Sequence, residues 1–578
     1  MSSMPSRYSE KPMANAPYSA VARNSQETGR VHFNADHRDS ESAADIEDND
    51  IFDSSANTID AMEVADNDTL YYGMSLGTRR KLHKGRGFWI TVISLVLVSV
   101  VGMFWLYFDG ISWTQQSKKR NVILMVSDGF GPASETMARN FVQQIKGLPI
   151  GYQSPLDEIL VGSSRTRSSD SLITDSAAGA TAFSCQLKTY NGAISVTDAK
   201  TPCGTVMEAA KLQRGMATGL VVTSRITHAT PAAFSAHAAS RNMEDLIAEY
   251  QVGNYSLGPI MDLMLGGGRC HFMPNTKPES SCRLDNRDLW AEAKATGYHT
   301  LSTRKEFDAL DIDRNAKEQP SLAEMADKAL GILNTATKNK NAGFFLMIEG
   351  SRIDMAAHTN DPAAHLRDIV AYWDAVSVVR KFVDEHPDTV LISVSDHETG
   401  GFSVAKQLTP QYPEYVWNPR ALEPVQHSIE YMSAQLLKQM DGSDQEAKYK
   451  FVRDTVFPKW FGAKDATHEE IMNIAAETDS VVLRQLLSNA ISNRAQIGWA
   501  THGHSAVDVN LYAYGNGAEK LKGNHENTEI GKFIVDVLGL DLESVTTKIR
   551  SERVFQATQP IKEAWLGRRD LDAPEHYH

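Results

Sequence analysis

Cysteine is scarce in this sequence, and no run of basic residues is long enough to follow a phosphate backbone. Four cysteines in 578 residues are too few for a small fold held together by disulfides. The formal net charge is −14, so we expect no nucleic-acid partner. No internal repeat is present. With 42% hydrophobic residues, the chain is long enough to bury a sizeable core.

The first 110 residues differ in composition from the rest. Residues 1–78 are acidic and rich in Ser, Asn, Ala and Asp, which predicts a disordered tail. A basic cluster at 79–86 precedes residues 88–108, which carry no charge and, as a helix, would span about 30 Å. Residues 79–110 are therefore predicted to hold a basic flank and one transmembrane signal-anchor; a buried core helix is the alternative. The basic cluster favours a cytosolic N-terminus.

Features beyond the predicted span suit a lumenal or extracellular compartment. All four cysteines lie there, as does the glycosylation acceptor Asn254 in Asn-Tyr-Ser. Four cysteines allow three pairings. Loop length favours the pairs Cys185–Cys203 and Cys270–Cys282, and four free buried thiols are the alternative.

Beyond residue 120, short apolar runs alternate with helical periodicity. Strands are predicted at 122–127, 219–223, 344–348, 389–395 and 508–514, and helices at 205–212, 322–337 and 362–386. This pattern predicts an α/β fold with a central, mostly parallel sheet flanked by helices, after the disordered tail and the transmembrane helix. We assign residues 111–545 to one domain with a helical insertion at about 404–495, and 546–578 to a polar C-terminal extension.

Polar side chains follow four of the predicted strands. They are Asp128, His228 with Thr230, Glu349, and Asp396 with His397. Ligands of an open α/β sheet collect at the carboxyl ends of its strands, so these residues are expected at one rim. Each has an ordinary alternative: a turn former, a salt-bridge partner or a core histidine. Their joint occurrence favours a metal site.

Two ligand chemistries are present in this set. Asp354 and His358 are four residues apart, which places both on one face of a helix. Mixed histidine and carboxylate ligands suit zinc, whereas the oxygen donors of Asp128, Thr230 and Glu349 suit magnesium.

Ser176 is the candidate nucleophile. It lies in Thr-Asp-Ser-Ala-Ala-Gly-Ala, where small residues would leave the first N–H groups of a helix open to an anion. The alternative is that Asp175 and Ser176 only cap the helix. No histidine is adjacent in sequence, but a bound cation can activate a hydroxyl instead.

Five short strings, in this order, resemble those of alkaline phosphatases, over about residues 120–540: Asp175-Ser176-Ala177, His228-Ala229-Thr230-Pro231, Glu349-Gly350-Ser351-Arg352-Ile353-Asp354, Asp396-His397-Glu398-Thr399-Gly400-Gly401 and Thr501-His502-Gly503-His504. The resemblance implies two zinc ions and one magnesium ion per subunit. One zinc would be held by Asp354, His358 and His504, and the other by Asp128, Asp396 and His397. Asp128 would bridge to magnesium, with Thr230 and Glu349.

The same resemblance implies the remaining roles. Arg241 would grip the phosphate, and His228 would lie behind the ligands without binding an ion. His504 is preferred to His502 because its spacing to Gly515 is the one the family shows.

The implied activity is metal-dependent hydrolysis of small phosphate monoesters through a phosphoserine at Ser176, with broad specificity and an alkaline optimum. Phosphopeptides are further candidate substrates. The acidic tail and signal-anchor resemble those of fungal vacuolar members, which implies a homodimeric, single-pass type II protein of the vacuole membrane with a lumenal catalytic domain. The alternatives are a phosphodiesterase of the same fold and a catalytically silent membrane glycoprotein braced by metals.

Overall fold

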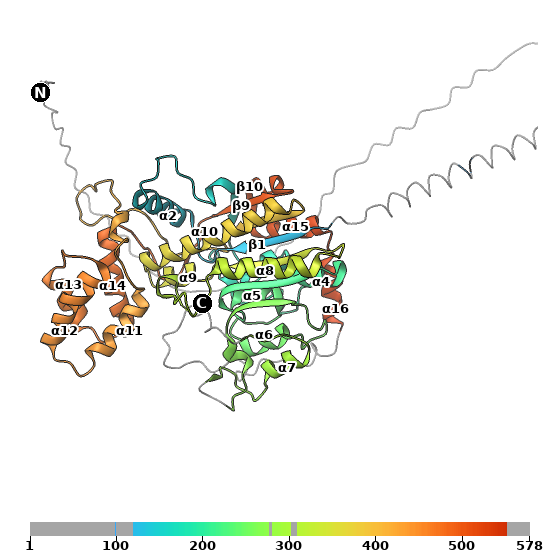
Figure 1. The fold of residues 1–578 in the computed structure, drawn as a ribbon, viewed down its shortest axis with the longest axis horizontal. Helices are drawn as coiled ribbons and strands as arrows, with labels where there is room; N and C mark the ends of the chain where they lie inside the picture. The colour runs from blue at the N-terminus through green and yellow to red at the C-terminus, as the bar shows by residue number, and fades with distance from the viewer. Residues whose placement is uncertain (1–96, 98, 100–118, 277–279, 302–308, 552–578) are drawn as a thin grey trace, which may run out of the picture. The chain divides into compact units, whose positions relative to one another are not determined.

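The computed structural model describes residues 119–276, 280–301 and 309–551, together with Leu97 and Ser99 (Figure 1). The predicted tail and, apart from those two residues, the predicted span lie outside this part of the chain. No helix within the described ranges has the length and apolar character needed to cross a bilayer.

The described residues form an eight-stranded sheet in the order β10-β2-β9-β6-β1-β5-β3-β4. Strands β6, β1, β5, β3 and β4 run parallel, and β2 is parallel to β10. The prediction of a mostly parallel sheet is confirmed. Strand β9 is antiparallel to both β6 and β2, a direction that its apolar pattern could not reveal. The bounds of these strands are β1 (Asn121–Val126), β2 (Leu160–Arg165), β3 (Ala217–Arg225), β4 (Leu263–Gly267), β5 (Phe344–Glu349), β6 (Thr389–Val394), β9 (Val509–Gly515) and β10 (Gly523–Glu526).

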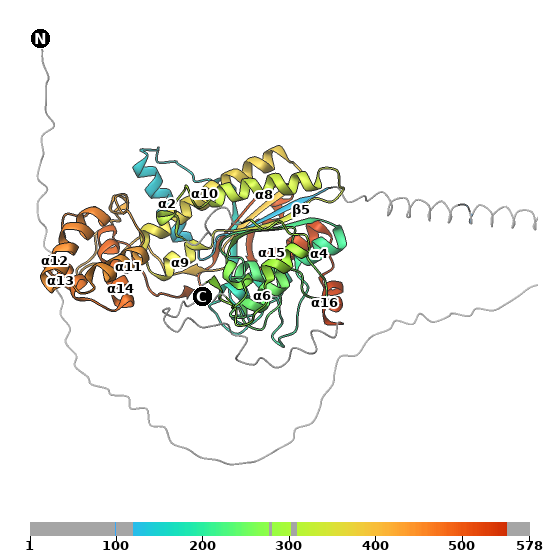
Figure 2. The same cartoon turned by 60° about the horizontal axis from the view of Figure 1, so that its bottom comes forward.

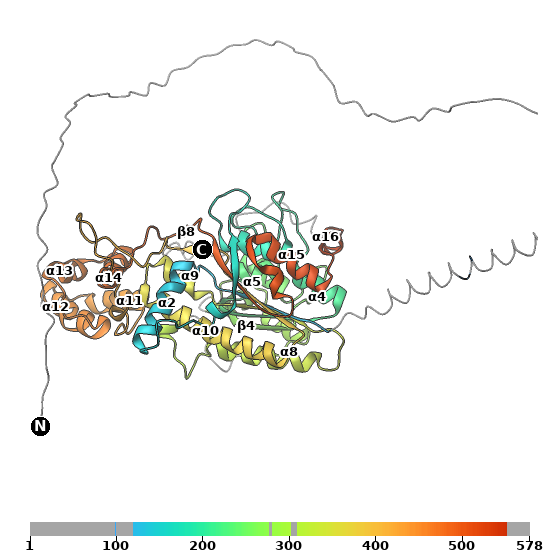
Figure 3. The ribbon, with the colours of Figure 1, turned by 90° about the horizontal axis from the view of Figure 1, so that it is seen from above.

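The central strands are apolar throughout because helices cover both of their faces. On β1, Ile123 and Met125 pack into one core, whereas Val122 and Leu124 pack into the other. Figure 3 shows α8 and α10 on one side of the sheet and α4, α15 and α16 on the other. Both faces therefore bury apolar surface, and each Å² removed from water stabilises the fold by about 25 cal/mol.

Local sequence explains where the main helices begin. Helix α8 starts after Ser321, whose hydroxyl accepts from the Glu324 amide while the Glu324 carboxylate accepts from the Ser321 amide. Asp361 caps α10 in front of a proline at its first turn. The helices of the sheet domain are α2 (Pro132–Ile145), α3 (Ser176–Cys185), α4 (Val206–Arg214), α5 (Ala229–Ser235), α6 (Glu244–Gln251), α7 (Leu289–Ala295), α8 (Leu322–Thr337), α9 (Arg352–His358), α10 (Pro362–Glu385), α15 (Asn527–Leu538) and α16 (Leu542–Arg550) (Figures 1 and 2).

Residues 404–495 hold four α-helices beside the sheet domain, drawn in orange in Figure 1. They are α11 (Ile429–Met440), α12 (Gln445–Phe451), α13 (His468–Ala476) and α14 (Ser480–Ala495), with a π-helix at Val452–Phe461 between α12 and α13. Leu436 and Leu487 belong to the same apolar core as Ile369 of α10. This helical segment is thus packed onto the sheet domain rather than tethered to it.

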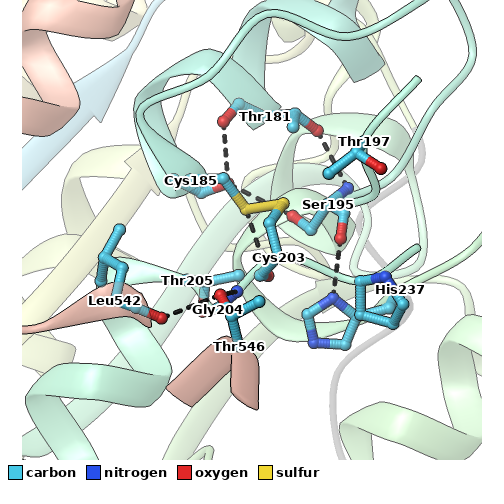
Figure 4. The surroundings of a disulfide bond; sticks show 12 residues. Thr181, Cys185, Ser195, Thr197, Cys203, Gly204, Thr205, His237, Leu542 and Thr546 are labelled. Atoms are coloured by element: carbon cyan, nitrogen blue, oxygen red, sulfur yellow. Dashed lines mark hydrogen bonds between the residues drawn. A yellow bond between two sulfur atoms is a disulfide. The ribbon is translucent and has the colours of Figure 1, made fainter. Parts of the chain in front are cut away.

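The boundary predicted at residue 545 falls inside α16, so residues 546–550 continue the helix that begins at Leu542. Val545 and Ile549 lie one helical turn apart and are buried. Thr546 accepts a hydrogen bond of 2.8 Å from the Gly204 amide (Figure 4). Val545 and Ile549 belong to an apolar core of the sheet domain, and Leu542 packs against the same core.

Both predicted disulfides are present, and they leave no free cysteine within the described ranges. Cys185 and Cys203 have Cα atoms 6.0 Å apart, and those of Cys270 and Cys282 are 4.9 Å apart. Figure 4 shows the Cys185–Cys203 bridge at the end of α3, beside Ser195. The bridge ties helix α3, which begins at Ser176, to the segment before α4.

Candidate active site and metal centre

The carboxyl ends of the parallel strands bring the predicted residues together. In the ladder, Val126 of β1 lies opposite Glu349 of β5 and Val394 of β6. Asp128 and Asp396 each lie two residues beyond these pairs, and both are fully buried. The rim of a parallel sheet therefore collects three carboxylates from distant parts of the chain.

A first group forms around Asp354 on α9. Its Oδ1 lies 3.2 Å from Nε2 of His358, the partner one turn along the helix, and 3.7 Å from Nε2 of His504. The two histidine Nε2 atoms are 3.1 Å apart. His504 lies on β8 (His504–Ser505), which pairs with β7 (Glu398–Thr399). The pairing of β7 with β8 thus places His504 beside Asp354 of α9.

A second group contains Asp128, Asp396 and His397. Nε2 of His397 lies 3.5 Å from Oδ1 of Asp128 and 3.3 Å from Oδ2 of Asp396. Adjacent residues reach one site because β6 ends at Val394 and the chain then turns. Gly400 and Gly401 follow with backbone φ values of 94° and 54°, which residues other than glycine rarely adopt.

A third group contains Asp128, Glu349 and His228, whose candidate ligand atoms lie within 4.8 Å of one another. Thr230 joins it, with its hydroxyl 3.4 Å from Oδ2 of Asp128. His228 has its Nε2 3.3 Å from Nη2 of Arg241. A guanidinium can only donate, so the neutral imidazole carries its proton on Nδ1 and has no lone pair left for an ion.

Ser176 is the first residue of α3, and its hydroxyl faces the cluster. Oγ lies 3.1 Å from Nε2 of His397 and the residue is 1% exposed. Asp175 caps the helix by accepting from the Ala178 amide. His504 reaches back to the same segment, where its Nδ1 lies 2.7 Å from the Thr174 carbonyl oxygen. That contact leaves Nε2 of His504 free to face the first group.

Asp175 and Thr399 were missed as site residues in the sequence. Asp175 Oδ2 accepts from Nη1 of Arg241 at 3.0 Å and from the Gly192 amide at 2.9 Å, so it holds the arginine beside Ser176. Thr399 donates to Oδ1 of Asp354 and lies 3.3 Å from Nδ1 of His397. Both residues occur inside the quoted motifs, which was the available signal. The His502 ring contacts Gln485 and the backbone carbonyl oxygen of His358, and it does not face the candidate ligand atoms.

Electrostatics of the cluster favour bound cations. Burial raises the pKa of Glu349 to about 8 and that of Asp396 to about 7, and burial with three neighbouring carboxylates raises the pKa of Asp128 well above its usual value. Burial also lowers the pKa of His397 and of His504, so both imidazoles stay neutral. A neutral imidazole can bind a cation, and a cation would offset the repulsion between the crowded carboxylates.

Unmet hydrogen-bonding capacity supports the same conclusion. Within the described part of the chain, Oδ1 of Asp128, Oε1 of Glu349 and Oδ2 of Asp396 are buried without a hydrogen-bond partner. A buried polar atom left in that state costs about 1–3 kcal/mol. Divalent ions bound by these oxygens and the neighbouring imidazoles would remove the cost, so the donor set fits zinc and magnesium.

With metals removed, we expect the free energy of unfolding to fall as the pH rises from about 6.5 to about 9. In this window the folded state binds more protons than the unfolded one, because the pKa of Asp396 is about 7 and that of Glu349 about 8, both above their unfolded values. The expected loss from these two carboxyl groups is about 3 kcal/mol. His271, whose pKa the neighbouring Glu244 raises to about 9 against the effect of burial, loses its proton in the same window and adds to the fall. Urea unfolding of chelated protein at the two pH values measures it, and a rise with pH would contradict it.

Comparisons with known proteins agree with this geometry. A family model described as alkaline phosphatase matches residues 119–311 and 309–540. The repressible alkaline phosphatase of Saccharomyces cerevisiae is 46% identical over 492 residues, which cover 77% of this chain and 86% of the yeast protein. The alkaline phosphatase of Schizosaccharomyces pombe is 46% identical over 487 residues, covering 81% of this chain and 90% of that protein. A crystal structure of a cold-active alkaline phosphatase from Shewanella sp. superposes with a TM-score of 0.61 at 30% identity, covering 72% of this chain and 99% of that one.

The fold, the side chains at its rim and these matches define an enzyme that hydrolyses phosphate monoesters. The chain belongs to the alkaline phosphatase family, and the resemblance found in its short motifs is confirmed.

Proposed function

We propose that the enzyme is a metal-dependent phosphatase whose Ser176 is transiently phosphorylated. The observation that carries this proposal is the position of the Ser176 hydroxyl, buried at the N-terminus of α3 and 3.1 Å from His397 in the middle of the cluster. Helix N-termini attract anions because their first N–H groups are unpaired.

The proposed ligand sets follow the groups described above. One zinc would be held by Asp354, His358 and His504, a second by Asp128, Asp396 and His397, and magnesium by Asp128, Thr230 and Glu349. When bound, such ions lower the pKa of a nearby hydroxyl and neutralise charge on phosphate oxygens. His228 would act through Arg241, because its Nε2 faces the guanidinium.

In the proposed reaction, two substitutions take place at phosphorus, one after the other. A bond forms between Ser176 Oγ and phosphorus while the bond to the alcohol oxygen breaks, giving a phosphoserine. Water then breaks the Oγ–phosphorus bond and releases inorganic phosphate and the free hydroxyl. Arg241, anchored by Asp175, can bind two phosphate oxygens through its planar fork. The first amides of α3 stabilise the same charge.

Trapping of the intermediate tests this proposal. Enzyme mixed with p-nitrophenyl phosphate and quenched in acid should carry one phosphate on the peptide that contains Ser176, detected by mass spectrometry. Phosphate on another residue, or turnover with no phosphorylated peptide at any time, would contradict the role of Ser176.

Replacement of Asp175 by alanine is expected to loosen Arg241. Inorganic phosphate should then inhibit about 10- to 150-fold more weakly, because a charge-assisted hydrogen bond contributes about 1.5–3 kcal/mol and 1.4 kcal/mol corresponds to a factor of ten. Loss of the helix cap should also lower the free energy of unfolding by about 1 kcal/mol. Asp444 caps the exposed helix α12 in the same way, so Asp444→Ala is the matched control. Equal phosphate inhibition in both variants would argue against the anchoring role.

A broad substrate range and an alkaline optimum are part of the proposal. Little of the described machinery grips the carbon skeleton of the leaving group, which supports broad specificity; phosphopeptides are candidate substrates beside small monoesters. Ligand histidines must stay neutral to bind metal, which supports activity at high pH. A pH–rate profile with its maximum near 5 would contradict the second point.

Two alternatives are tested by direct comparison. A phosphodiesterase of the same fold would hydrolyse bis-p-nitrophenyl phosphate faster than the monoester; Ser176, as opposed to threonine, favours the monoester. A silent glycoprotein braced by metals would bind zinc without turnover of either ester.

Location and assembly are proposed from the sequence and from the resemblance. The enzyme would be a type II protein of the vacuole membrane with its catalytic domain in the lumen, and a homodimer. Asn254 is exposed, as a glycan acceptor must be, and the two disulfides suit a lumenal domain. Glycosidase digestion of the cellular protein and light scattering of the purified enzyme test these points; an unshifted band or a monomer mass would contradict them.

A further inference from the structure

Helix α14 of the helical segment contacts the metal-binding region through a row of polar side chains. Gln485, Ser488 and Ser492 lie three and seven residues apart, on one face of the helix, and we call this row the α14 stripe. Gln485 and Ser492 bond to the segment that precedes His504, and Ser488 bonds to the segment that follows His358. The stripe therefore joins an insertion that lacks ligands to the site itself.

The first connection runs through His502 to the ligand His358. Nε2 of His502 is 2.6 Å from Oε1 of Gln485, and its Nδ1 is 2.8 Å from the carbonyl oxygen of His358. In return, Nδ1 of His358 bonds to the carbonyl oxygen of His502. Both residues thus hold each other through a side chain and a backbone group.

The second and third connections use the two serines. Ser488 donates to the Asn360 carbonyl oxygen at 2.7 Å, and the Asn360 side chain donates to the Thr501 carbonyl oxygen at 2.9 Å. Ser492 accepts from Nε1 of Trp499 at 3.1 Å. The Trp499 ring fills the space in which a side chain at Gly400 would lie, three residues after His397.

We propose that His502 and the α14 stripe are positioning residues that orient the first metal group. A carbonyl oxygen accepts only, so the bond from His358 Nδ1 to His502 fixes the proton on Nδ1 and leaves the Nε2 lone pair for an ion. That Nε2 faces Asp354 and His504. His502 is therefore no ligand itself, since both its ring nitrogens are engaged away from the cluster.

This inference rests on the proposed metal dependence, and the test separates the two. The variants are His502→Ala, His502→Asn, Gln485→Ala and Ser488→Ala in the full-length protein. Gln439→Ala, at an exposed position of α11, is the matched control on the same insertion. Asparagine can still donate to the His358 carbonyl but is too short to reach Gln485. The measurements are zinc loss to a chelator, the zinc concentration that gives half-maximal activity, and kcat at saturating zinc.

We expect His502→Ala to raise the half-maximal zinc concentration by about 10-fold, the lower end of the range for such partners of metal ligands. Gln485→Ala, Ser488→Ala and His502→Asn should give smaller increases, with kcat restored at high zinc in all four. Unchanged zinc affinity and zinc loss in all of them, matching Gln439→Ala, would overturn the proposal. If His502→Ala does not fold, the other three variants decide. Absence of zinc from the wild-type enzyme would instead refute the proposed function.

Discussion

Replacement of Ser176 with alanine should abolish phosphatase turnover while leaving the fold intact. In the proposed mechanism this hydroxyl attacks phosphorus, so the loss should be on the order of 10⁴-fold or more in kcat. The side-chain contact that the substitution removes is the one between Ser176 Oγ and His397, so the free energy of unfolding should change little. Turnover of p-nitrophenyl phosphate and urea unfolding measure the two effects.

Ser184 provides the matched control because it lies on the same helix α3, is equally buried and also carries a hydroxyl. Its Oγ contacts Ser195 at 3.3 Å, away from the rim. Ser184→Ala should therefore keep most of the activity. If Ser176→Ala retained activity and metal content close to those of the wild type, another group would be the nucleophile.

Removal of the bound metals should have an effect of similar size on activity and a large effect on stability. Without cations, the buried carboxylates face one another without compensation, and the Ser176 hydroxyl keeps its ordinary reactivity. Each ion present at about 1,000 times its Kd adds about 4 kcal/mol to the free energy of unfolding, so chelation should lower Tm strongly. Differential scanning calorimetry and rates before and after chelation measure both.

Adding back the ions provides the control for chelation. Zinc with magnesium should restore activity and Tm, and chelator already saturated with metal should have no effect. Zinc alone should restore less activity than both ions if the third group takes magnesium. Activity that persisted in protein shown by elemental analysis to be metal-free would contradict the proposed chemistry.

Local sequence was sufficient for much of the fold. Helix α8 begins and ends at the residues that helical periodicity predicted, and the apolar runs of β1, β5 and β6 became buried central strands. Strands β2, β4 and β10 were missed because they are short or partly exposed and lack a continuous apolar run. The direction of β9 depends on its partners, which lie far away in sequence.

Residues that act through another group were the hardest to foresee. Asp175 has the appearance of an ordinary helix cap, and only the folded chain shows that its second oxygen holds Arg241, 66 residues away. His502 resembled a possible ligand, yet the structure directs it to Gln485 and to the backbone of His358. Spacing along the chain cannot distinguish these cases because both depend on which segments meet.

The sequence alone determined which side chains are able to bind metal and phosphate, since the chemistry of a carboxylate, an imidazole or a guanidinium is intrinsic to the residue. Folding decided which of them meet. Parallel strands bring Asp128, Glu349 and Asp396 to a single rim, and the β7–β8 pair adds His504 from more than one hundred residues further on. The burial that raises the pKa of these carboxylates is likewise a property of the packed molecule, because it arises only when surrounding atoms exclude water.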